Sequence, residues 1–144
     1  MPRWSRSRYL KQAVAGFLAL GALVGILLLT LTPNGSEQYQ LSIIPFAGNS
    51  ASLPHGDVSS FLINTAGNVV LFMPLGMFVP LALPGFRRLG KITLFGGLLS
   101  LGIETAQYFL PFGRFASTTD LILNTTGTAL GYVMLRVLAW LLEP

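Results

Sequence analysis

Seven polar side chains in or beside otherwise apolar stretches are the candidates for chemistry in this sequence. Amide side chains offer donors and acceptors to sugars and peptides, and a guanidinium offers a planar fork to phosphate. Two carboxylates in a poorly hydrated setting could divide into a general acid and a general base. We take as candidate ligand-binding residues Asn64, Asn68, Glu104, Gln107, Arg114, Asp120 and Asn124, with Glu104 and Asp120 as candidate catalytic residues.

Other kinds of site find little support in the sequence. Cysteine is absent and His55 is the only histidine, so no group of residues has the spacing of metal ligands. A phosphate-binding glycine loop with lysine and a GxSxG nucleophile elbow are also absent. We therefore expect no metal and no cofactor, and the sequence favours a binding protein over an enzyme.

The elements that must position these residues are four long apolar segments. Hydrophobic residues make up 52% of the 144 residues and charged residues only 10%, whereas a soluble domain has about 25% charged residues. A membrane-spanning helix needs about 20 mostly apolar residues. Segments of this kind lie at about 13–31, 58–83, 92–110 and 121–142. The sequence thus predicts an all-α, polytopic membrane protein, a four-transmembrane-helix bundle that forms one integral membrane domain over residues 1–144.

The first segment has a basic front, as a signal peptide does. Its apolar run is longer than the 7–15 residues of a typical signal-peptide core, and no small-x-small cleavage site follows it. We expect it to remain as an uncleaved anchor.

Basic residues predict the orientation of the bundle. They cluster before the first segment, between the second and third, and near the end of the fourth, whereas residues 32–57 contain no Lys or Arg. Because cytoplasmic loops carry an excess of Lys and Arg, we expect both termini to be cytoplasmic in a multi-pass bacterial plasma-membrane protein. This placement explains the net charge of +4 without any binding to nucleic acid. We expect membrane lipid, and no nucleic acid, as a partner.

The candidate residues fall at similar depths in three of the segments. Asn64 and Asn68 lie about 9 and 15 Å below the outer end of the second segment. Gln107 and Glu104 lie about 5 and 9 Å below the outer end of the third. Asp120 opens the fourth segment and Arg114 precedes it. We expect an outward-facing polar site in the outer half of the bilayer.

Hydrogen bonding between helices is the structural alternative for these residues. Asn and Gln in membrane spans often bond across helices, and Gly127 and Gly131 form a small-xxx-small packing stripe. A carboxylate within a span is costly, so Glu104 needs a partner or a task. Arg114 and Asp120 are the candidate partners, and a structural role for Glu104 stays open beside a functional one.

Three polar runs stand in a fixed order along the chain. They read NTAGNVVLFMPLG at 64–76, ETAQYFLPFGR at 104–114 and DLILNTTGTALG at 120–131, and Ile44-Pro45-Phe46 precedes them. In order, spacing and polar positions these runs resemble the signatures of the VanZ-like family of bacterial membrane proteins, over roughly residues 40–135. The resemblance implies a plasma-membrane protein related to those that give low-level resistance to teicoplanin-type glycopeptides.

Three functions fit the polar layer and the resemblance. The first is binding of a cell-envelope amphiphile, either a lipid-linked wall precursor or a lipoglycopeptide, which contributes to low-level glycopeptide resistance. The second is a membrane-embedded hydrolase or transferase that acts on a lipid-linked substrate through Glu104 and Asp120, with Arg114 stabilising negative charge. The third is a small transporter or proton relay, for which four helices are few unless the chain forms a homo-oligomer.

Overall fold

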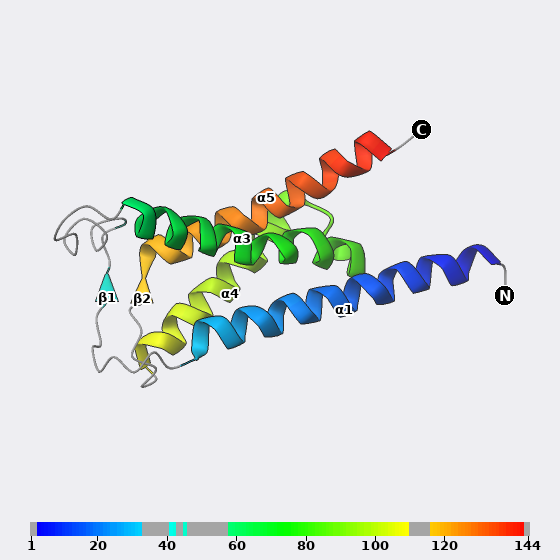
Figure 1. The fold of residues 1–144 in the computed structure, drawn as a ribbon. Coiled ribbons are helices and arrows are strands. Elements are labelled where there is room, and N and C mark those ends of the chain that lie inside the picture. The colour runs from blue at the N-terminus through cyan, green and yellow to red at the C-terminus, as the bar shows by residue number, and fades with distance from the viewer. Residues whose placement is uncertain (1–2, 33–40, 43–44, 46–57, 110–115, 143–144) are drawn as a thin grey trace.

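A computed structural model describes residues 3–32, 41–42, 45, 58–109 and 116–142 of the chain. Two strands of two residues each pair in parallel at one end of the molecule. The predicted all-α class is confirmed for this part of the chain, apart from that short strand pair. The elements are α1 (Arg3–Leu31), β1 (Leu41–Ser42), α3 (Val58–Ala82), the 3-10 turn η1 (Pro84–Phe86), α4 (Leu89–Phe109), β2 (Ala116–Ser117) and α5 (Thr118–Leu142) (Figure 1).

Three of the described helices are long and apolar enough to cross a membrane: α1 over residues 7–31, α3 over 65–82, and α5 throughout. Helix α4 is not among these three, and it contains the polar residues Glu104 and Gln107. Both side chains are turned inward, with only 8% and 5% of their surface exposed. Leu94 and Leu98 on the same helix are exposed. The helix therefore keeps its polar groups inside the molecule and presents apolar side chains outward.

The two central helices, α3 and α5, run in the same direction and approach closely. Gly127 lies against the backbone of Val69, and Gly131 lies against the backbone of Met73 one turn further on. A Cβ atom added at either glycine would overlap a carbonyl group of α3, so only glycine permits this spacing. The predicted small-residue stripe is confirmed as the contact between these helices.

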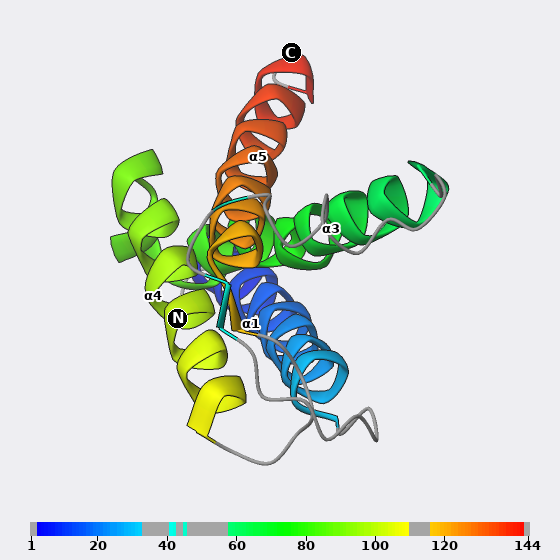
Figure 2. The ribbon, with the colours of Figure 1, turned by 90° about the vertical axis from the view of Figure 1, so that its left-hand side faces the viewer.

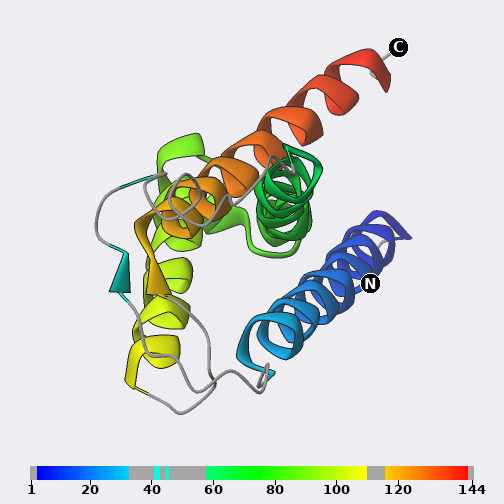
Figure 3. The ribbon, with the colours of Figure 1, turned by 60° about the vertical axis from the view of Figure 1, so that its left-hand side comes forward.

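The remaining two helices flank this pair. Helix α1 packs on α3, and α4 packs on α5. Figures 2 and 3 show α3 and α4 on opposite sides of α5, with α1 beside α3. The buried hydrophobic core contains side chains from all four of these helices, including Tyr132 of α5. Its fully buried members are Ile26, Phe72, Leu75 and Ile92.

The helices have two distinct ends. The first residues of α1 and the last residues of α5 lie on the same side of the molecule, apart from each other (Figure 1). The opposite end holds the end of α1, the starts of α3 and α5, the end of α4 and the paired strands. We call this second end the polar end, because it holds Asn68, Glu104, Gln107 and Asp120.

Candidate functional site

At the polar end, a hydrogen bond between side chains joins the two central helices. Asn68 Nδ2 on α3 donates to Asp120 Oδ1 on α5, with 2.6 Å between the two atoms. Asp120 is the third residue of α5, where the helix macrodipole places partial positive charge and favours an anion. Both side chains are partly exposed, so this pair can be approached from outside the molecule.

The second carboxylate, Glu104, is fixed to the start of α5 from the side of α4. The backbone N–H of Ser117 donates to Glu104 Oε2 at 2.7 Å. The Oγ atom of Ser117 accepts the backbone N–H of Thr119 at 3.2 Å, which makes Ser117 the N-cap of α5. Glu104 therefore helps to position the residue at which α5 begins.

The two carboxylates lie near each other. Asp120 is three residues beyond Ser117, whose backbone N–H donates to Glu104, so both carboxylates lie at the first turn of α5. Of the two partners predicted for Glu104, Asp120 is thus a neighbour, whereas the hydrogen-bond donor is the Ser117 backbone. Arg114, the other predicted partner, lies outside the described residues. The side chain of Asn64, on the first turns of α3, is likewise not described.

The remaining two candidates bond between helices. Gln107 Nε2 donates to the backbone oxygen of Thr30 at 2.8 Å, and so satisfies a carbonyl at the end of α1 that has no partner within its helix. Asn124 Nδ2 donates to Ser100 Oγ on α4 at 3.0 Å, while Asn124 Oδ1 is buried and has no partner among the described atoms. Gln107 and Asn124 thus tie α4 to α1 and to α5.

The sequence interpretation missed three of the partners at this end. Ser117 could have been found, because Ser117 through Asp120 has the Ser-x-x-acid pattern that precedes many helices. Thr30 and Ser100 carry no such signal, since small hydroxyl residues are frequent in apolar helices for packing reasons alone. Among the described residues, no group of three or more His, Cys, Asp or Glu could hold a metal ion.

This arrangement of acceptor oxygens can bind a ligand that donates hydrogen bonds. Carboxylate oxygens are acceptors only, and each can accept more than one hydrogen bond. The partly exposed amide of Asn68 adds a carbonyl oxygen nearby. A ligand suited to this end of the molecule would present hydroxyl, amide N–H or ammonium groups.

Comparison with known proteins gives one match. The model of the family described as VanZ/LLP1 matches residues 16–140, which is most of the chain. No curated protein and no solved structure matches the chain.

Proposed function

Because the chain belongs to the VanZ/LLP1 family, we propose that its polar end binds the head group of a cell-envelope amphiphile. In this proposal all four helices cross the plasma membrane, both termini are cytoplasmic, and the polar end faces outward. The ligand is a lipid-linked wall precursor or a lipoglycopeptide, and its binding contributes to low-level glycopeptide resistance. Both ligands carry hydroxyl and amide donors above apolar chains.

The observation that supports this proposal is the placement of Asp120. It is held by Asn68 at 2.6 Å, three residues beyond the serine whose N–H donates to Glu104, at the start of a helix where negative charge is favoured. Ionisable residues in membrane segments are costly and are typically kept for a function. Two of them gathered at one end, of which Asp120 is partly exposed, make an acceptor site for a polar head group.

The proposed topology predicts which loops can be labelled from outside. Because the chain has no cysteine, single cysteines can be introduced without background. Ser50→Cys, between α1 and α3, should react with a membrane-impermeant maleimide in intact cells. Gly85→Cys, in η1, should react only after the cells are permeabilised. Equal labelling of the two positions in intact cells would contradict the topology.

Removing the charge of Asp120 tests the binding site. Asp120→Asn keeps an oxygen that can accept from Asn68, so the helix pair should remain folded. A hydrogen bond to a charged group contributes about 1.5–3 kcal/mol, so we expect affinity for teicoplanin or for a lipid-linked wall precursor to fall about tenfold or more. The measurement is binding of each labelled compound to the purified chain in lipid nanodiscs, together with teicoplanin susceptibility of cells that express it.

Thr126→Val is the matched control for that variant. Thr126 lies on the same helix, is exposed, and bonds only to the backbone oxygen of Ile122 within its own helix. It should bind both compounds as the unaltered chain does. If Asp120→Asn equals Thr126→Val in binding and in susceptibility at equal expression, the polar end is not the binding site.

A second candidate function rests on the proximity of the two carboxylates. Glu104 is the more buried of the two and Asp120 the more exposed, and both lie at the first turn of α5. Such a pair can serve as acid and base for hydrolysis or transfer on a lipid-linked substrate. Turnover of a labelled lipid-linked precursor by the purified chain, lost in Asp120→Asn, would favour this function over binding alone.

A further inference from the structure

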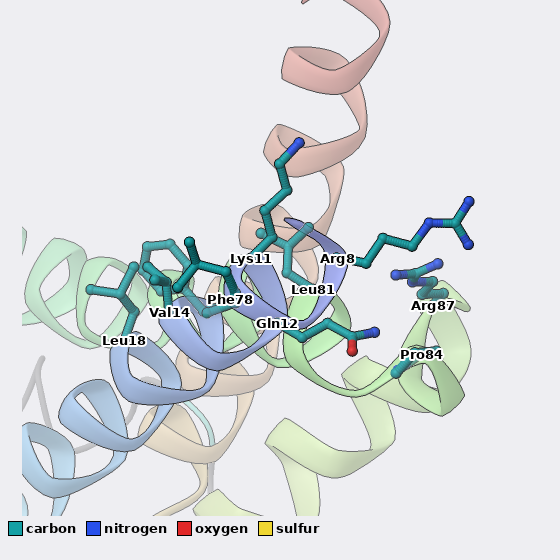
Figure 4. A pocket seen from close by; sticks show the side chains of 11 residues that line it. Arg8, Lys11, Gln12, Val14, Leu18, Phe78, Leu81, Pro84 and Arg87 are labelled. Atoms are coloured by element: carbon teal, nitrogen blue, oxygen red, sulfur yellow. The ribbon is translucent and has the colours of Figure 1, made fainter. Parts of the chain in front are cut away.

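A cavity of about 970 Å³ lies at the end of the molecule away from the polar end, between the first half of α1 and the end of α3. Its walls include apolar side chains from both helices, and basic side chains line it as well. Figure 4 shows Arg8 and Arg87 at one end of this cavity and Val14, Leu18 and Phe78 at the other. We call it the basal groove.

Sequence periodicity explains how one side of the groove is formed. Arg8, Lys11, Ala15 and Leu18 recur at spacings of three and four residues, so they lie along one stripe of α1. The stripe begins with two cations and continues with apolar residues. It therefore changes from charged to apolar along the helix axis.

On the other side of the groove, Arg87 is held by hydrogen bonds of both its side chain and its backbone. Pro80 would normally give its backbone oxygen to the N–H of residue 84, but Pro84 has no N–H. Arg87 Nε donates to that oxygen instead, at 3.2 Å. Tyr132 on α5 donates its hydroxyl to the backbone oxygen of Arg87 at 2.7 Å. The guanidinium is thus fixed beside the groove by its Nε atom.

The charge around this groove is uncompensated within the part of the chain that the structure describes. The two acidic side chains in that part of the chain, Glu104 and Asp120, both form hydrogen bonds at the polar end. Arg8, Lys11 and Arg87 therefore face the groove without an acidic partner among the described residues. An anion that entered the groove would meet three cations.

The dimensions of the groove fit one leaflet of a bilayer. Arg8 and Leu18 are ten residues apart on a helix, which is about 15 Å. The hydrocarbon core of one leaflet is also about 15 Å, half of the full thickness of about 30 Å. A free phosphate would occupy only the basic end and leave the apolar wall uncovered, whereas a lipid would cover both.

We propose that the basal groove binds one anionic phospholipid, with its phosphate at Arg8, Lys11 and Arg87 and an acyl chain along Val14, Leu18 and Phe78. Arginine is suited to this task because its planar group donates two parallel hydrogen bonds to phosphate oxygens. The site is distinct from the polar end and lies on the side of the chain termini. It would select lipids of that leaflet by head-group charge.

Native mass spectrometry of the full chain, titrated with phosphatidylglycerol or phosphatidylcholine, tests this site. We expect one phosphatidylglycerol to bind at least fivefold more tightly than phosphatidylcholine. Arg8→Gln and Arg87→Gln should each weaken phosphatidylglycerol binding about fivefold, the effect of one cation near a lipid head group. Because Arg87 also bonds Pro80, Arg8→Gln, which removes no described hydrogen bond, keeps the test valid if Arg87→Gln unfolds.

Arg88→Gln is the matched control, since Arg88 is adjacent in sequence and exposed but does not line the groove. It should leave the affinity unchanged. Equal binding of the two lipids, or an equal loss in Arg88→Gln and Arg8→Gln, would overturn the proposal. Competition by soluble glycerophosphate as effective as that by phosphatidylglycerol would also overturn it, because it would indicate a simple anion site.

Discussion

Gly131→Ala is expected to destabilise the chain severely, although alanine is the better helix former. The added Cβ would lie within 3 Å of the backbone carbonyl atoms of Met73. Backbone atoms cannot rotate away as a side chain does, so α3 and α5 would have to separate. Overpacking a core costs about 1–3 kcal/mol, and we expect a loss at the upper end of that range. Thermal unfolding of the purified chain in detergent measures it.

Gly102→Ala is the control for this prediction. Gly102 is exposed on α4, and a Cβ there would meet nothing within 4 Å. Because Gly costs about 1 kcal/mol relative to Ala in a helix, this variant should be as stable as the original or more so. The two substitutions are chemically identical, so opposite signs would isolate the contact between α3 and α5. A Gly131→Ala chain as stable as Gly102→Ala would show that the helices are not in close contact there.

The sequence predicted the helices because each is a long run of apolar residues. It also predicted a packing stripe at Gly127 and Gly131, since two glycines four residues apart leave a flat stripe on one helix face, but it did not predict that α3 packs there. The weaker signal was α4, in which Glu104 and Gln107 lower the hydropathy. Those residues are buried against other parts of the chain, and a composition average cannot show whether a polar side chain faces lipid or protein.

The neighbours of each polar residue were harder to predict than its face. Asp120 and Asn124 are four residues apart and share one face of α5. Asp120 nevertheless bonds Asn68 on α3, whereas Asn124 bonds Ser100 on α4. Helical periodicity fixes a direction around one helix. It contains no information on which of two flanking helices stands in that direction at a given height.

Substitutions of Glu104 should separate its structural role from its chemical one. Glu104→Ala removes the acceptor for the Ser117 N–H, which leaves a backbone donor without its partner at the N-cap of α5. An unsatisfied buried donor costs about 1–3 kcal/mol, so we expect a clear loss of thermal stability in detergent. Glu104→Gln retains a carbonyl oxygen at the same position and should recover most of that stability.

Teicoplanin susceptibility of cells that express each variant supplies the second measurement. If the negative charge beside Asp120 contributes to the binding site, the Glu104→Gln chain should fold but should no longer protect the cells from teicoplanin, like the Glu104→Ala chain. Thr105→Val is the control, because Thr105 is the next residue, is exposed, and bonds only Leu101 within its own helix. A Glu104→Gln chain that is both stable and fully protective would mean that Glu104 acts only as an acceptor for the start of α5. The site at the polar end would then depend on Asp120 alone.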